Sequence, residues 1–381
     1  MDSEIQPPEN QAASVNPESQ PPSFGLTPSP PSLLHRIFLG PQGLRAGWSA
    51  TLFLLIFLPL GIGVSTGVRF VSRQILHRPE PSNSSVFTPG TAILSEGLTV
   101  LVLLIAASIM ARIEHRRVLD YNLRGPGRIS RFASGLVTGF AALSLLVGML
   151  YFGGWIHFGP VALTGGQIFL YAALWAVGFL FVGLSEEGVC RCYLQFTLTR
   201  GINFWWALGG QLIMCASLLP GKAGQGAYGV YLCAALGVIP CFILHKKATT
   251  RSAFWQAAWL ISTFFGFIHT SNNGETWVGI FQAAAVGFIF CVSVYVTGSA
   301  WWAIGCHAAW DWAESYFYGT ADSGYIAKGH LLTTAPSGPA LLSGGTDGPE
   351  GSILGIGALL FLLLVLLVQY GRAKKATEAP A

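Results

Sequence analysis

The stretch Leu184-Ser185-Glu186-Glu187-Gly188-Val189-Cys190-Arg191 places two adjacent carboxylates and an arginine at the end of an apolar run that begins at Ile168. Ionisable side chains at membrane depth are costly and usually functional. On a helix, Glu187 and Arg191 are four residues apart with the acid N-terminal, which is the better order for an ion pair. Glu186 points in another direction. We therefore expect Glu187 to be neutralised by Arg191 and Glu186 to be free to meet a group from another helix.

Two histidines are candidates for that group. His269 ends the stretch Phe265-Gly266-Phe267-Ile268-His269, and His307 begins the stretch His307-Ala308-Ala309-Trp310-Asp311. Each histidine has a motif partner four residues away, on the same face of a helix. A lone histidine inside a membrane is commonly a hydrogen-bond partner between helices, so the functional reading depends on the three stretches occurring together.

In this order, the three stretches resemble the CPBP family of intramembrane proteases, which are related to the CAAX prenyl endopeptidases and include bacteriocin-processing and Abi-like proteins. The family signature is EExxxR, then FxxxH, then HxxxN or HxxxD. The resemblance extends from about Phe169 to Phe317, and the segment from Arg116 to Leu123 resembles the lead-in that precedes the family's core. Cys190 and Cys192 depart from the family pattern, which often has an aromatic residue and a glycine at these positions.

The resemblance implies an intramembrane endopeptidase that hydrolyses a peptide bond of a membrane-presented peptide or protein. The catalytic residues that it implies are Glu186, Glu187, Arg191, His269, His307 and Asp311.

The composition independently indicates a membrane protein. Hydrophobic residues make up 52% of the chain and charged residues 10%, whereas a soluble domain has about 25% charged residues. The prediction is an all-α, polytopic transmembrane bundle with about 8–10 spans of roughly 20 residues each. Ten apolar runs lie at about 48–68, 91–111, 132–153, 167–185, 203–219, 226–245, 254–269, 277–297, 299–313 and 353–370.

The chain divides by composition into five predicted parts. These are a disordered Pro/Ser-rich tail (1–35), N-terminal transmembrane helices (36–160), a protease-like core (161–318) with an inserted hairpin around 207–253, a mobile Gly-rich outer loop (319–352), and a last helix with a basic tail (353–381). The tail lacks the basic region and short apolar core of a cleaved signal peptide. The first apolar run is therefore expected to remain as a span.

The positive charges predict orientation rather than a nucleic-acid partner, because they lie between apolar runs. With both termini inside, 16 of the 21 Lys and Arg are cytoplasmic, as the positive-inside rule requires. We expect an integral protein of the cell (inner) membrane that contacts the bilayer and binds no nucleic acid. The seven cysteines lie in or beside apolar runs and are interpreted as small apolar side chains.

The three motifs must also lie at the same depth in the membrane if their side chains are to meet. If the first motif helix ended at Gly183, Glu186 would lie at the cytoplasmic face, far from His269. The three motifs reach one depth if that helix continues, straight or kinked, to Arg200. We therefore predict a long helix and a water-filled cavity that reaches the site.

Two mechanisms suit the same residues. In the first, Glu186, His269 and His307 ligate a divalent metal such as zinc, whose bound water is the nucleophile. In the second, no metal is involved: Glu186 and His269 activate water, while His307 and Asp311 stabilise the oxyanion. The metal-free form is preferred, because three separate helices meet hydrogen-bond tolerances more easily than metal-bond tolerances.

Two other classes of function suit parts of the same pattern. Glu186, Arg191 and Asp311 would also suit a proton or ion relay in a transporter, but the motif spans do not recur in the other half of the chain. A non-catalytic immunity or scaffold member of the same family is the other alternative.

Overall fold

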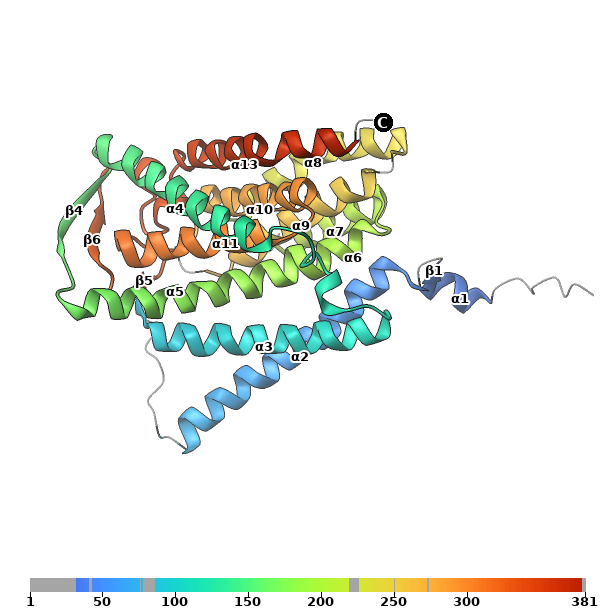
Figure 1. Cartoon of the computed structure of the whole chain (residues 1–381), viewed down its shortest axis with the longest axis horizontal. Coiled ribbons are helices and arrows are strands. Elements are labelled where there is room, and N and C mark those ends of the chain that lie inside the picture. The colour runs from blue at the N-terminus through green and yellow to red at the C-terminus, as the bar shows by residue number, and fades with distance from the viewer. Residues whose placement is uncertain are drawn as a thin grey trace, which may run out of the picture.

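The structure is a computed structural model that describes residues 32–40, 43–75, 77, 86–218, 226–249, 251–272 and 274–378. The predicted tail over 1–35 lies almost wholly outside these residues, as do the residues at the predicted turn of the hairpin, 219–225. The described chain is mostly helical, and the helices run close to one common direction (Figure 1).

A helix forms in each of the ten apolar ranges. Six of these helices, two of them extended by helical turns of a different pitch, are long and apolar enough to cross a membrane. They are α2 (Ala46–Phe70), α3 (Pro89–Ile113), α4 (Arg128–Phe152), α5 (Gly166–Glu187), α8 (Ala227–Lys247) and α10 (Trp277–Thr297). The other four are α7 (Phe204–Leu218), α9 (Ser252–His269), α11 (Trp301–Asp311) and α13 (Gly355–Glu378). The prediction of a polytopic helical membrane protein is therefore confirmed.

The first motif helix continues well past Glu187. The chain passes from α5 into a π-helical segment, η3 (Gly188–Leu194), and then into α6 (Gln195–Thr199). Together they form one apolar helix of 34 residues, Gly166–Thr199. This confirms the predicted long helix, and it places Glu186 and Glu187 in the interior of the bundle.

Helix α11 lies inside the bundle, packed against α4, α5 and α10. Two glycines of α4 permit the close approach: a Cβ atom on Gly135 or Gly139 would meet the backbone of Trp302 or of Cys306. Most of α11 is consequently buried. It ends in a second π-helical segment, η5 (Trp312–Tyr318).

The bundle has two distinct ends, which we call the lead-in end and the loop end. At the lead-in end, residues 114–123 include a short 3-10 helix, η2 (Val118–Asp120). There the Tyr121 hydroxyl donates to Glu114, and the Asn122 amide nitrogen Nδ2 donates to the carbonyl of Arg191 at 2.7 Å. The segment that resembles the family's lead-in is thus bonded to the first motif helix.

The loop end, residues 319–354, contains more structure than a Gly-rich loop predicts. Three two-stranded sheets are described: β1 (Leu39–Gly40) with β2 (Gly43–Leu44), β3 (Val86–Phe87) with β5 (Ile326–Ala327), and β4 (Ile156–Val161) with β6 (Leu332–Pro336). The second is parallel, and the other two are antiparallel. Strands β5 and β6 belong to the loop end, which also carries α12 (Ala340–Ser343) and a 3-10 helix, η6 (Pro349–Gly351).

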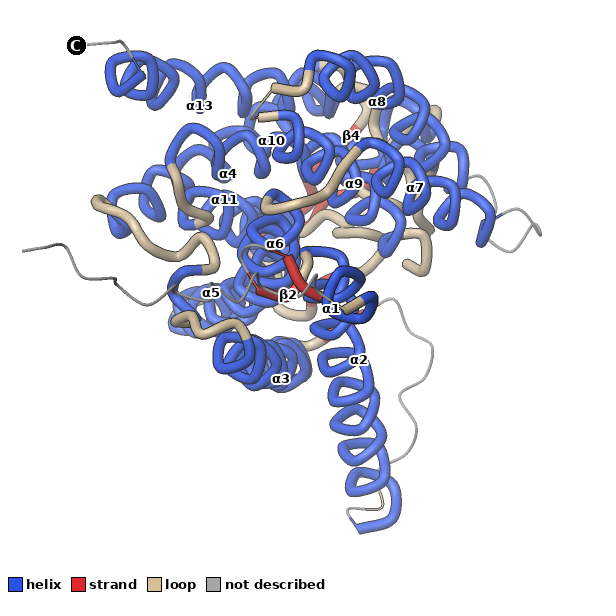
Figure 2. The backbone as a smooth tube through the Cα atoms, turned by 90° about the vertical axis from the view of Figure 1, so that its right-hand side faces the viewer, coloured by secondary structure: helices blue, strands red, loops and turns tan. Residues whose placement is uncertain are grey.

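The remaining elements pack around this framework. Helix α1 (Leu33–Phe38) precedes the first span. Helix α2 diverges from the bundle along its length, as the view along the bundle shows (Figure 2). Helices α7 and α8, in the region predicted as an inserted hairpin, pack on α9. There the Gln211 amide donates to the Trp259 carbonyl at 3.2 Å, and the Trp259 indole donates to the Cys233 carbonyl at 3.2 Å.

Candidate active site

The site begins with the predicted pair on the first motif helix. Arg191 Nη1 lies 3.1 Å from Glu187 Oε1, and both side chains are fully buried. The guanidinium carbon also lies 4.3 Å from the centre of the Phe265 ring and 5.4 Å from that of Phe290. A buried charge needs a partner of this kind. The expected ion pair is confirmed, and aromatic rings from two other helices surround it.

Glu187 has a second partner that the sequence did not indicate. Its Oε1 atom lies 2.9 Å from Nδ1 of His307, on α11. Because an ionised carboxylate can only accept, His307 donates from Nδ1. One carboxylate oxygen therefore joins the first motif to the third and fixes the orientation of the imidazole.

The other ring nitrogen of His307 faces two more acids. Nε2 lies 3.8 Å from Glu186 Oε2 and 3.6 Å from Asp311 Oδ2. Both distances exceed an ordinary hydrogen bond, so there is room for Nε2 to serve an additional partner. The structure thus brings Glu186, Glu187 and Asp311 around one histidine.

His269 is held separately, by its own helix. Its Nδ1 atom lies 2.7 Å from the Phe265 carbonyl oxygen. A carbonyl oxygen only accepts, so Nδ1 carries the hydrogen and, in the neutral ring, Nε2 keeps its lone pair. The Phe265 ring is centred 4.7 Å from the ring of His269 and 6.0 Å from that of His307. This aromatic ring contacts both motif histidines.

A cavity of about 510 Å³ connects these residues. Glu186, His269, His307 and Asp311 line it, and it continues to Tyr325 at the loop end. A hydrolytic site inside a bundle needs such a space, because water has to reach the scissile bond.

Glu96 is a cavity residue whose position the sequence did not predict. Because Glu96 lies near the start of an apolar run, the sequence indicates that its side chain extends to the membrane surface. In the structure it lines the cavity and accepts a hydrogen bond from the Ser185 hydroxyl at 3.2 Å. Nothing in the sequence pairs α3 with α5, so only tertiary packing reveals this contact.

Buried acids at and beside the loop end have raised pKa values: Asp322 lines the cavity, whereas Glu275, in the loop between α9 and α10, does not. Burial raises the pKa of Asp322 to about 6, although a hydrogen bond from Ser315 opposes the shift. Burial, reinforced by Asp347 and then Glu350, raises the pKa of Glu275 to about 9. The first group is therefore mostly ionised at neutral pH, whereas the second is mostly protonated.

The three residues that would ligate zinc in the metal-dependent mechanism do not meet at one point. Zinc bonds of about 2.0–2.2 Å would bring three ligand atoms within roughly 4 Å of one another. Among the described residues, Glu186, His269 and His307 do not form a group whose ligand atoms all lie within 4.8 Å of one another. Their chemistry suits zinc, but the spacing of these three side chains does not, and we derive no step through a metal.

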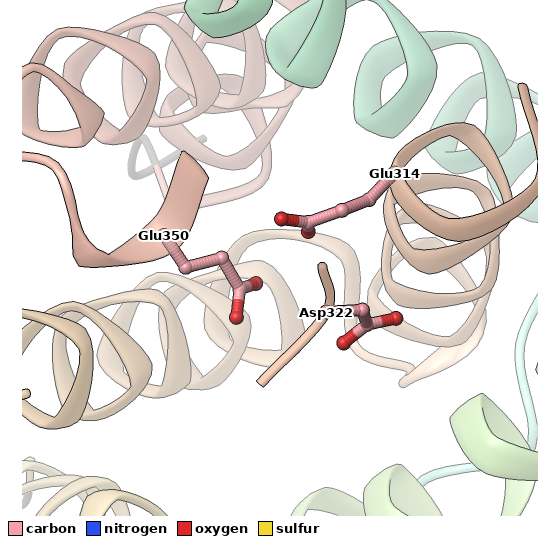
Figure 3. A group of neighbouring side chains, drawn as sticks. All are labelled: Glu314, Asp322 and Glu350. Carbon is pink, nitrogen blue, oxygen red and sulfur yellow. The ribbon is translucent and has the colours of Figure 1, made fainter. Parts of the chain in front are cut away.

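A different group does meet this distance condition: Glu314, Asp322 and Glu350 (Figure 3). None of these acids was predicted as a site residue. Glu314 follows the third motif, and the other two lie in a segment rich in Gly, Ser, Thr and Pro. Such a segment has no periodic pattern that would predict which of its side chains turn inwards.

Part of the chain matches a known protein family. Residues 242–313 match the family model described as type II CAAX prenyl endopeptidase Rce1-like. No curated protein and no solved structure matches the chain. The matched range includes His269, His307 and Asp311, while the Glu186–Arg191 motif lies before it. The chain therefore carries, in residues 242–313, a domain of the Rce1-like type II CAAX prenyl endopeptidase family, which is a family of peptidases.

Proposed function

We propose that the protein is an intramembrane endopeptidase that hydrolyses a peptide bond of a membrane-presented protein or peptide. One observation carries this proposal. Glu187 Oε1 lies 2.9 Å from Nδ1 of His307 and holds the ring. Nε2 of the same ring faces Glu186 and Asp311 in a cavity that His269 also lines. This arrangement supports a site built from the six residues that the family resemblance implies.

Glu186 and His269 activate the water. The buried Oε2 atom of Glu186 has no hydrogen-bond partner among the described residues, and Nε2 of His269 keeps a lone pair. Water between them loses a proton to one of these groups as its oxygen attacks the scissile carbonyl carbon. The leaving amine then takes that proton as the C–N bond breaks, which releases an amine and a carboxylic acid.

His307 and Asp311 act on the developing oxyanion. Nδ1 of His307 is occupied by Glu187, so a proton on Nε2 is free to be donated to the oxyanion. Asp311, with 7% of its surface exposed, lies 3.6 Å from Nε2 and favours the protonated ring. Arg191 fixes Glu187 and thereby acts through it as a positioning residue.

The test uses purified protein in detergent and a fluorogenic prenylated CAAX peptide, the substrate class in the family's name. Glu186→Gln, His269→Asn and His307→Asn should each reduce kcat/KM by about 10²–10⁴, the usual contribution of a general acid or base. Membrane insertion should be unchanged, since none of the substitutions shortens an apolar run.

Glu275→Gln is the matched control. Glu275 lies in the loop between α9 and α10 and is not among the cavity residues, so this variant should keep wild-type kcat/KM. Cleavage that persists in the three site variants would contradict the assignment. An unprenylated copy of the peptide, tested alongside, reports whether the lipid group is required.

A further inference from the structure

Three carboxylates converge at the loop end of the cavity. Glu314 comes from η5, Asp322 from the turn that follows, and Glu350 from η6. One oxygen of each lies within 4.8 Å of one oxygen of the others. Figure 3 shows the three carboxylates near one another, on separate parts of the chain.

Uncharged hydrogen-bond donors position these three carboxylates and do not neutralise them. The Trp310 indole N–H lies 2.9 Å from Glu314 Oε2 and 2.8 Å from Glu350 Oε1, bridging both carboxylates. The Ser315 hydroxyl donates to Asp322 Oδ2 at 2.8 Å. Among the described residues, no Lys, Arg or His forms a salt bridge with any of the three acids.

A second observation points to a ligand. Glu314 is 0% exposed, and its Oε1 atom has no hydrogen-bond partner among the described residues. Gly348, with φ at +112°, packs closely beside this atom: a Cβ there would clash with the Ala321 carbonyl oxygen and lie 3.3 Å from Oε1, so no side chain from this position covers Oε1. A buried, unpaired carboxylate oxygen is costly. Figure 3 shows this carboxylate directed towards the other two.

We propose that Glu314, Asp322 and Glu350 bind a hard divalent cation, Ca²⁺ or Mg²⁺. Both ions prefer oxygen ligands, and Ca²⁺ accepts irregular arrangements with bonds of about 2.3–2.6 Å. Two oxygens on opposite sides of such an ion lie roughly 5 Å apart, which matches the spacing of the cluster. Zinc is disfavoured, because the cluster offers no nitrogen or sulfur ligand.

The cation would connect the loop end to the helix that carries the third motif. Asp322 and Glu350 line the same cavity as His307, and Glu314 follows α11 directly. Binding would therefore fix one wall of the cavity relative to His307. This site shares no residue with the catalytic set, although it lies on the same cavity, and its existence does not depend on the reaction proposed above.

The first experiment is calorimetric titration of the full-length protein in detergent, after chelator treatment, with CaCl₂ and MgCl₂ separately. We expect one equivalent of at least one cation to bind. Asp322→Asn and Glu350→Gln should each weaken its affinity at least tenfold, because each removes a charged ligand. The Glu275→Gln control should change the affinity less than threefold, because it removes only a neighbouring acid.

Absence of binding by the wild-type protein would overturn the proposal, whatever the variants do. An equal loss in the cluster variants and the control would also overturn it, because that result would indicate general attraction to acidic residues. Thermal unfolding of each chelated variant shows whether it is folded. If either cluster variant is unfolded, Glu314→Gln replaces it.

A second measurement locates the ion. Tb³⁺ binds at oxygen-ligand sites and emits when a nearby excited indole transfers energy to it. Trp310, which is bonded to two of the carboxylates, should be the main donor. Emission should fall in Trp310→Phe while calorimetric binding persists, and excess Ca²⁺ should abolish it in the wild type. Unchanged emission in Trp310→Phe would place the ion elsewhere and refute the assignment.

Discussion

At the scale of single residues, Glu187 connects the site. One of its oxygens accepts from Arg191 at 3.1 Å and from His307 at 2.9 Å. The first contact could be predicted, because both residues belong to one helix with a fixed spacing. The second joins residues 120 positions apart, and helical geometry alone says nothing about such pairs. Sequence reasoning therefore named the candidate residues but not which acid holds His307.

Arg191→Ala should lower the folded yield more than it alters the chemistry of molecules that do fold. The substitution leaves the buried carboxylate of Glu187 with His307 as its remaining charged partner. Removing one member of a buried ion pair typically costs about 3–5 kcal/mol. Yield is measured by size-exclusion chromatography, and kcat is measured on the monodisperse fraction.

A double variant separates the two roles of Arg191. Arg191→Met with Glu187→Gln removes both charges and should recover part of the yield, because no buried charge is left unpaired. Full yield of Arg191→Ala with no activity would show instead that the guanidinium acts directly on the substrate.

At the scale of elements, the helices were predictable because apolar length is a strong signal. The long first motif helix followed from the requirement that three motifs reach one depth, and Gly166–Thr199 satisfies it. The π-helical form of η3 and η5, directly after the first and third motifs, has no signal in the pattern. Strands β3 and β5 were also missed, because two-residue strands are too short to show alternation.

Close packing of α4 on α11 supports the position of His307, and Gly139→Ala tests it. The new methyl group would meet the carbonyl of Cys306, one residue before His307. Overpacking of this kind costs typically about 1–3 kcal/mol. We expect a lower melting temperature and a lower kcat, because α11 has to move away from α4.

Gly148→Ala on the same helix is the control. A Cβ at Gly148 meets nothing within 4 Å, so the substitution should leave kcat unchanged. Its melting temperature should equal or slightly exceed that of the wild type, since Ala is favoured over Gly inside a helix by about 0.5–1 kcal/mol. Equal effects of the two substitutions would show that the glycines of α4 do not position α11.

At the scale of the whole molecule, the ends of the bundle differ in charge. At the lead-in end, basic residues end α3 and α8 and begin α4, namely Arg112, His245, Lys246, Lys247 and Arg128. The loop end instead gathers the acids Asp322, Asp347 and Glu350, with the mostly protonated Glu275 beside them in the loop between α9 and α10. The sequence predicted the basic side from the positive-inside rule. It did not predict the acidic side, because that charge assembles from two loops far apart in the chain.

This asymmetry predicts the orientation of the protein in the membrane, with the lead-in end in the cytoplasm and the loop end outside. Single cysteines introduced at exposed positions test it: Ala340→Cys at the loop end, and Leu119→Cys, at a position that is 45% exposed, at the lead-in end. A membrane-impermeant maleimide added to intact cells should label the first. The second should be labelled only after permeabilisation.

The native cysteines are buried or half-buried, so the wild-type chain provides the background. The reverse pattern would place the loop end, and the cavity that continues to it, on the cytoplasmic side, so that substrate and water would enter from there.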